Sequence, residues 1–175
     1  YEMSASLVGS EMCIRDRATV CLAVPLYEQL ELLKKNKVAV VCGILSGTLA
    51  SLTGIFVLCM LFGFNHQQYV TMLPKSITTA IGIGISEELG GIVTITVAVI
   101  IITGILGNVI ADTVFHIFKI KNPLAKGLAL GTASHAIGTA RAIEMGPVEG
   151  AMSSLAVAVA GLLTVVFVSG FAQLI

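Results

Sequence analysis

The sequence predicts an all-α, polytopic membrane protein with paired short, broken or re-entrant helices, as in a transporter-like repeat. Three observations predict this class. The first is composition: 56% of the 175 residues are hydrophobic, only 11% are charged, and the mean hydropathy is +0.98. A soluble domain carries about 25% charged residues, so this chain has too few to cover a soluble core. The other two observations are three long uncharged runs and two shorter glycine-rich segments.

The first seventeen residues, YEMSASLVGSEMCIRDR, do not fit a membrane protein. They lack the basic start and apolar stretch of a signal peptide, and they resemble a translated sequencing adaptor. We expect residues 1–17 to be non-native; the alternative is that they form a short disordered tail. We expect residues 18–175 to form a membrane domain that has lost its native N-terminus. Residues 18–27 are apolar and contain Pro25, which predicts the remaining half of a broken helix. Residues 28–36 then form a short amphipathic connector.

Three uncharged runs are each long enough to cross a bilayer as a helix. Residues 38–64 form a run of 27, residues 91–111 a run of 21 and residues 150–175 a run of 26. The hydrocarbon core needs about 20 apolar residues of helix. Alternating apolar and polar positions are absent, which argues against a membrane β-barrel. We therefore expect three spanning helices.

Between these runs lie two segments, residues 73–91 and 127–146, that are apolar but short and rich in glycine and hydroxyl groups. A shift of 56 positions aligns them. It places Ala80-Ile81-Gly82 on Ala136-Ile137-Gly138, Ser76 on Thr132, Thr78 on Ser134, Glu88 on Glu144 and Gly90 on Gly146. Paired interrupted segments at corresponding places in two halves are a pointer to the binding site of a transporter.

A helix that begins inside the membrane leaves its first N–H groups unpaired, and its dipole makes that end positive. Two such ends that face each other can bind a carboxylate or a phosphate, and Ser or Thr hydroxyls can cap them. The candidate substrate-binding residues are Lys75, Ser76, Thr78, Thr79, Thr132, Ser134, His135, Thr139 and Arg141. Lys75 and Arg141 add positive charge, and His135 and Glu144 are candidates for proton coupling.

Each candidate also has a structural alternative. Ser and Thr in membrane helices often bond their own backbone or a neighbouring helix. Lys75 and Arg141 can extend to the lipid headgroups as topology anchors. Asp112 can lie at the interface or face a cavity. No metal-ligand spacing, cofactor motif or nucleophile–base arrangement appears, so we expect no metal, no cofactor and no enzyme; the net charge of zero gives no reason to expect nucleic acid.

The lysines predict a topology. Lys34, Lys35 and Lys37 precede the first run, and Lys119, Lys121 and Lys126 follow the second. If residues 74–90 enter and leave by the same face, both clusters fall on one side, which the positive-inside rule makes cytoplasmic. If these residues cross fully, the clusters fall on opposite sides. We prefer re-entry, which puts Glu87 and Glu88 outside, together with the C-terminus if residues 127–146 also re-enter.

Four motifs carry a resemblance to a known family. They are ATVCLAVPLY at 18–27, LPKSITT at 73–79, ITGILG at 102–107 and KGLALGTASHAIGTAR at 126–141. From Ala18 to its C-terminus the chain strongly resembles the LrgB/CidB family of membrane proteins. One departure is Ala80, where the family usually has proline, and we expect it to soften the break in the first short segment.

The resemblance implies two functions. Bacterial members are described as antiholin-like or holin-like modulators of murein hydrolase activity and autolysis, beside a small LrgA/CidA-type membrane partner. Relatives look like carriers of small carboxylates: pyruvate in some bacteria, and glycolate and glycerate in the chloroplast envelope. The resemblance also implies a multi-pass protein of the bacterial plasma membrane.

Two hypotheses follow. In the first, the chain is a secondary transporter of a small carboxylate anion, with its site between residues 74–84 and 130–141. In the second, it is a regulatory subunit without a substrate, and small-residue pairs such as Gly43-xxx-Gly47 form its oligomer interface. Polar side chains that converge on a central cavity would favour the first hypothesis.

Overall fold

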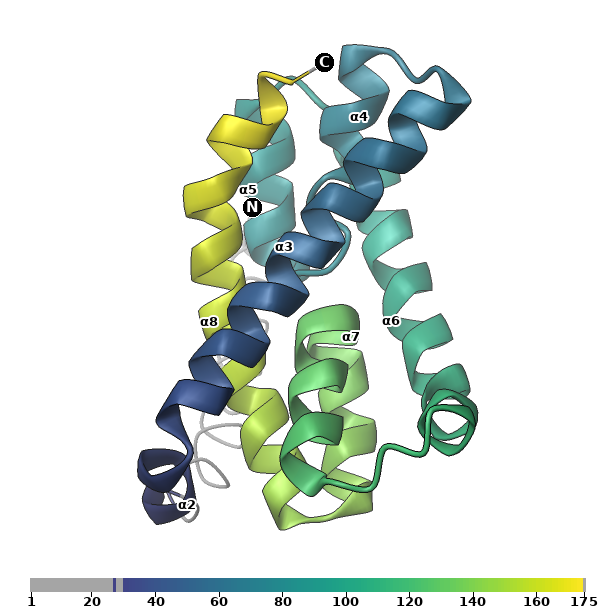
Figure 1. Cartoon of the computed structure of the whole chain (residues 1–175). Helices are drawn as coiled ribbons and strands as arrows, with labels where there is room; N and C mark the ends of the chain where they lie inside the picture. The colour runs from purple at the N-terminus through teal and green to yellow at the C-terminus, as the bar shows by residue number, and fades with distance from the viewer. Residues whose placement is uncertain (1–26, 28–29, 175) are drawn as a thin grey trace, which may run out of the picture.

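In a computed structural model, the described residues are Tyr27 and residues 30–174, and they fold into helices without strands. This confirms the all-α prediction. The helices, shown in Figure 1, are α2 (Leu30–Lys35), α3 (Lys37–Phe62), α4 (His66–Met72), α5 (Thr79–Glu88), α6 (Val93–Ile117), α7 (Pro123–Met145) and α8 (Pro147–Ala172). The expected half-helix at 18–27 and the tail at 1–17 lie outside the described residues, apart from Tyr27.

Within the described chain, α3, α6 and α8 are the helices long and apolar enough to cross a membrane, with 26, 25 and 26 residues. The prediction of three spans is confirmed. Helix α6 continues to Ile117, beyond the expected end at Ala111, and so includes Asp112. Its outer face is apolar and open, with Val109 72% exposed. Such a face is unfavourable in water but matches lipid tails.

The first short segment re-enters. Helix α4 starts with a capping box in which Asn65 and Gln68 exchange hydrogen bonds. The chain then leaves the helix at 73–78, and α5 returns toward the end at which α4 began (Figure 1). We call residues 66–88 hairpin 1. The break is present although Ala80 replaces the family's usual proline. Thr78, the N-cap residue of α5, has an extended backbone, and Ala80 lies in the first turn of α5.

The second short segment is also a hairpin, although its residues form one continuous helical element, α7, that is interrupted at a single residue. At His135 the backbone turns to φ 43° and ψ −136°, which is not helical. A Cβ placed on Gly138 would lie 2.9 Å from the carbonyl oxygen of Leu130. Residues eight apart in a straight helix are about 12 Å apart, so the chain reverses at His135. Both halves of α7 therefore have their outer ends at the same end of the molecule (Figure 1), and we call residues 123–145 hairpin 2.

The two halves of the fold repeat with inverted topology. The shift of 56 positions carries Thr79–Glu88 of α5 to 135–144, in the second half of α7, and Val93–Ile117 of α6 to 149–173, over α8. Hairpin 1 and α6 enter from the upper end in Figure 1, whereas hairpin 2 and α8 enter from the lower end. The predicted transporter-like repeat is thus present as an inverted repeat.

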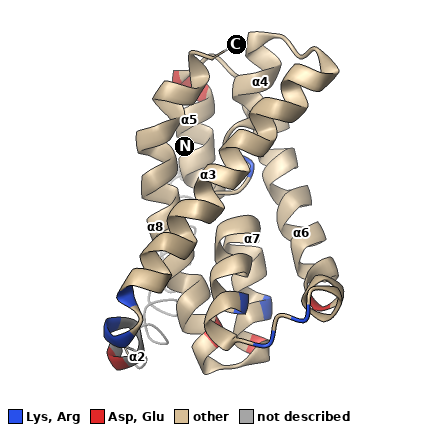
Figure 2. Ribbon diagram, viewed as in Figure 1, with Lys and Arg blue, Asp and Glu red and all other residues tan. Residues whose placement is uncertain are grey.

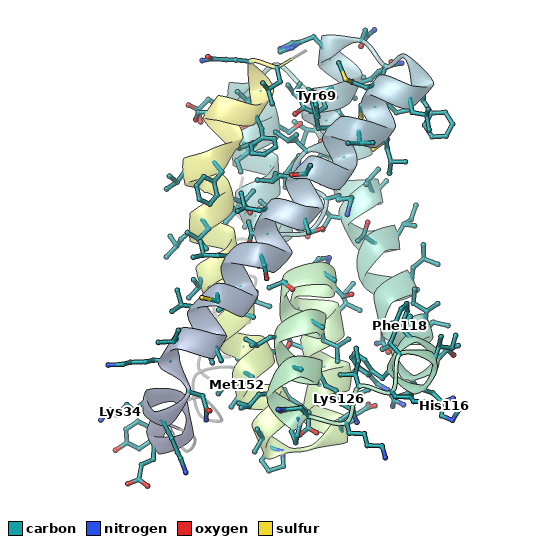
Figure 3. The ribbon with its side chains drawn as sticks, viewed as in Figure 1. Lys34, Tyr69, His116, Phe118, Lys126 and Met152 are labelled. Atoms are coloured by element: carbon teal, nitrogen blue, oxygen red, sulfur yellow. The ribbon has the colours of Figure 1, made fainter. Side chains whose placement is uncertain are left out.

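Apart from Lys75, the described lysines gather at one end of the molecule, together with several acidic residues (Figure 2). Figure 2 shows the lysines of α2, of the start of α3 and of the loop before α7 at one end, and the acidic residues Glu87 and Glu88 of α5 at the other end, near the C-terminus. In Figure 3, Lys34 and Lys126 lie at the lower end and Tyr69 at the upper end. Both lysine clusters therefore share one end, as re-entry of hairpin 1 predicted.

Candidate functional site

The described residues line an open cavity of about 1020 Å³ between α3, α6, the tip of hairpin 1 and the first half of α7. Its lining begins at Asn36 and Asn122, at the lysine-rich end. It reaches Lys75 and Ser76, at the break of hairpin 1. Since this break lies between the two ends of the spanning helices, the cavity leads from one face of the protein toward its middle (Figure 1).

The inner end of the cavity carries the Lys75 amino group and hydroxyl groups. Lys75 Nζ donates a hydrogen bond to Ser76 Oγ at 3.1 Å, and Ser51 Oγ donates to the same oxygen at 2.9 Å. A serine oxygen has two lone pairs, so these two bonds fill its acceptor capacity. The Ser76 hydroxyl hydrogen is therefore left to donate to a ligand, beside the N–H groups of Lys75.

Lys75 is the only charged side chain among the described residues that line this cavity. The ion pairs found in the described part of the chain involve Arg141 and not Lys75. A charge held away from water is costly unless an opposite charge or hydrogen bonds compensate it. The inner end of the cavity is consequently suited to an anion.

The first half of α7 brings two more predicted residues to the cavity, Thr132 and Ser134. The Thr132 hydroxyl donates to the carbonyl of Leu128 at 2.8 Å, as a membrane-helix threonine often does. Ser134 packs so closely on α6 that a Cβ at Gly107 would overlap its hydroxyl. Four of the predicted site residues, Lys75, Ser76, Thr132 and Ser134, thus meet in one place.

A second, much smaller cavity of about 10 Å³ adjoins Ser76. This volume holds about one water molecule. Hydroxyl groups line it from four elements, and they belong to Thr48, Ser51, Ser76, Thr132 and Thr164. Sequence reasoning missed Thr48, Ser51, Thr164 and also Thr103, which lines the large cavity, because it treated the long helices as uniform spans. The i, i+3 spacing of Thr48 and Ser51, which puts both on one helix face, was the available signal.

His135 and Thr139 do not line the cavity and instead hold hairpin 2 in place. His135 Nε2 lies 2.9 Å from the carbonyl oxygen of Ile100 on α6, and its ring packs on Gly104. Thr139 Oγ1 is 2.8 Å from Ser153 Oγ on α8. These contacts tie the tip of hairpin 2 to α6 and α8, so both residues position their neighbour Ser134.

The two half-helix N-termini do converge on the middle of α6. Near the start of α5, Gly82 packs on the Ile100 side chain, and His135 at the start of the second α7 half bonds the Ile100 carbonyl. Thr78 is the N-cap residue of α5 but makes no side-chain capping bond, and Thr78 and Thr79 are half-buried outside the cavity lining. The cavity is therefore lined by the residues before each half-helix rather than by the helix ends themselves.

Arg141 lies apart from Lys75. It forms an ion pair with Asp112 of α6 and a second pair with Glu144 at 2.7 Å; the two carboxylates are exposed and Arg141 is half-buried. This cluster lies in the lower part of the molecule, where α6 meets hairpin 2 (Figure 2). The structure therefore does not bring Arg141 and Glu144 into the cavity with the other candidates.

We expect Arg141→Gln to have a small effect. Exposed ion pairs contribute about 0–1 kcal/mol each, and Arg141 is outside the cavity. Binding of an anion in the cavity should stay within about twofold of wild type, and the unfolding temperature should fall by only a few degrees. Calorimetric titration and a thermal melt in the same detergent check both values. A loss of binding with an unchanged unfolding temperature would show that Arg141 belongs to the binding site.

The model of the LrgB-like family matches residues 13–174. This chain belongs to the LrgB-like family. The antiholin-like protein LrgB of Bacillus subtilis (strain 168) is 40% identical over 158 residues, which cover 90% of this chain and 68% of that protein. The protein of the same name from Bacillus cereus (strain B4264) is 42% identical over 154 residues, covering 88% and 67%. No solved structure matches the chain.

Membership of the LrgB-like family confirms the resemblance drawn from the four motifs. The relatives of this family that match the chain are named antiholin-like. In the described part of the chain, no group of three His, Cys, Asp or Glu side chains could hold a metal ion. The match begins inside the segment 1–17, and the expectation that this segment is non-native stays a prediction.

Proposed function

We propose that this LrgB-like protein is a transporter, or the membrane subunit of a transporter, for small carboxylate anions. One observation carries the proposal. Lys75 and the Ser76 hydroxyl lie at the inner end of a cavity that reaches one face, and no described carboxylate neutralises Lys75. A carboxylate bound there would accept hydrogen bonds from both groups and supply the missing negative charge.

The architecture supports transport as well. In transporters built from inverted repeats, the site lies near the membrane midplane at the interface of the repeats and is formed by interrupted helices. Here Lys75 and Ser76 come from the break of hairpin 1, and Thr132 and Ser134 from the tip of hairpin 2. Small movements of the two hairpins would expose these residues to either face in turn.

We also propose that the protein resides in the bacterial plasma membrane with its lysine-rich end in the cytoplasm. The relatives named above are from Bacillus. The lysines of α2, of the start of α3 and of the loop before α7 gather at one end (Figure 2), where the positive-inside rule places the cytoplasm. The cavity then opens toward the cytoplasm.

A second candidate function is that of an antiholin-like regulator of murein hydrolase activity, acting with a small LrgA/CidA-type membrane protein. The names of the relatives favour it. The Gly43-xxx-Gly47 pair, however, packs against another helix of the same chain. A Cβ at Gly43 would lie 3.1 Å from Leu128 Cδ1, and one at Gly47 would lie 2.9 Å from Thr132 Oγ1. This pair therefore packs α3 on hairpin 2 and is not the expected oligomer interface.

We expect Lys75→Gln to lower the uptake of labelled pyruvate or glycolate into proteoliposomes at least tenfold, since a charge-assisted hydrogen bond contributes about 1.5–3 kcal/mol. Lys37→Gln is the matched control, because Lys37 is exposed at the lysine-rich end and does not line the cavity. The assay uses the chain itself and a chimera in which residues 1–17 are replaced by the segment that precedes the matched region of the Bacillus subtilis relative.

Two results would contradict transport. One is the absence of saturable uptake by both proteins under any pH or sodium gradient, with and without the small partner. The other is equal uptake by wild type and Lys75→Gln. Loss of autolysis control in cells, combined with the first result, would favour the regulatory function.

A further inference from the structure

The cavity offers one described titratable side chain, Lys75, at its inner end. The elements packed around it present hydroxyl groups there: α3 presents Ser51, α6 presents Thr103, and α7 presents Thr132 and Ser134. The acidic residues of the described chain lie elsewhere. They are Glu31 on α2, Glu87 and Glu88 at the end of α5, Asp112 on α6, Glu144 on α7 and Glu149 at the start of α8.

The other candidates for proton coupling do not reach this place. His135 is buried, and its Nε2 is engaged with the Ile100 carbonyl on α6. It does not line the cavity. Glu144 is exposed and paired with Arg141. A group that couples a proton to an anion must meet both in the same site, and His135 and Glu144 do not.

We propose that Lys75 carries the proton that crosses the membrane with each carboxylate. This inference rests on the proposed transport function. The Lys75 amine takes a proton from water in the cavity and becomes an ammonium, which then binds the carboxylate. On the other side the anion leaves, the ammonium returns its proton to water, and the neutral amine resets the site. Each cycle moves one anion and one proton, so no net charge crosses.

Lys75 can couple proton binding to anion binding because its amine has few hydrogen-bond partners in the described structure. An ammonium has three N–H donors, and the described structure gives Lys75 Nζ one acceptor, Ser76 Oγ. A bound carboxylate supplies both further acceptors and the opposite charge, so it favours the protonated amine. Because linkage is reciprocal, protonation favours the anion by the same factor. Binding of the proton and binding of the carboxylate at Lys75 therefore strengthen each other.

Lys75→Arg separates anion binding from proton coupling, because a guanidinium binds carboxylates but is not deprotonated in proteins. In proteoliposomes, wild type should exchange labelled pyruvate at equal pH on both sides and should also accumulate it when the outside is acidic. We expect Lys75→Arg to keep exchange within about tenfold while losing the acid-driven accumulation, so that internal pyruvate stops at the external concentration. Accumulation by Lys75→Arg at the wild-type level would overturn the inference.

A second measurement does not depend on how well the arginine variant folds. Pyruvate is added to wild-type protein in weakly buffered detergent solution, and a pH indicator records proton uptake. We expect proton uptake in step with binding in wild type and in Glu144→Gln, whose substituted carboxylate lies outside the cavity. Binding by wild type without proton uptake would overturn the inference and leave the transport proposal intact. Absence of both exchange and binding in wild type would instead refute the proposed transport function.

Discussion

Replacing Gly131 with valine is expected to prevent hairpin 2 from docking on α8 and to destabilise the fold by about 3 kcal/mol or more. A Cβ at Gly131 would lie 2.5 Å from the backbone carbonyl oxygen of Ser153 and 2.7 Å from the Cβ of Ala156. Backbone atoms cannot rotate away, so the helices must separate. Gly127, one turn earlier, approaches the carbonyl of Glu149 in the same way. Small residues four apart allow such close helix contacts in membranes.

The matched control is Gly54→Val on α3, since a Cβ at Gly54 would meet nothing within 4 Å. Both variants and the wild type are purified in one detergent, and their unfolding is followed by fluorescence of a dye that reacts with newly exposed cysteines, Cys59 being buried in the fold. Gly54→Val should unfold like wild type. Equal stability of Gly131→Val and Gly54→Val would show that hairpin 2 does not pack on α8 as closely as described.

The second large effect is expected for Gly107→Ala, which should lower carboxylate uptake at least tenfold while leaving the protein folded. The added methyl group would overlap the Ser134 hydroxyl, and both residues line the large cavity. Ser134 would have to leave its position or α6 would have to move away from hairpin 2. Since misplacement of a binding group by about 1 Å can cost about 100-fold in rate, the cavity should lose much of its function.

A double variant makes this prediction specific. Ser134→Gly removes the side chain that the new methyl group would meet, so Gly107→Ala with Ser134→Gly should recover part of the uptake lost in Gly107→Ala alone. Non-additive effects are expected for residues in direct contact. If the two substitutions simply add, Gly107 and Ser134 are not in contact, and the described approach of hairpin 2 to α6 is wrong.

Much of the fold was predictable from local features of the sequence. The length of an uncharged run predicts a span, and this reasoning found α3, α6 and α8 with ends within a few residues, although it stopped α6 at Ala111. The lysine distribution correctly predicted re-entry of hairpin 1. The 56-residue repeat predicted that the second short segment would match the first, which it does as an inverted hairpin.

The site was predictable only in part. Hydroxyl and charged residues in the two short segments were identified as candidates, and Lys75, Ser76, Thr132 and Ser134 do meet at one cavity. Ser51 and Thr103 were missed because they lie in apolar spans, where the sequence pattern is dominated by length and hydropathy. Arg141 and His135 belong to the same motif as Ser134, but their side chains bind α6 and Glu144 instead of facing the cavity.

The sequence by itself determined the membrane class, the spans, the two interruptions and the family, because each depends on composition, run length or motif over neighbouring residues. Only the tertiary structure decided which polar groups share a cavity. Hairpin 2 reverses at His135, and this single backbone conformation points Ser134 toward Gly107 and turns Thr139 toward Ser153. The direction of a side chain at a reversal depends on the helices that pack around it, and those contacts join residues tens of positions apart in the chain.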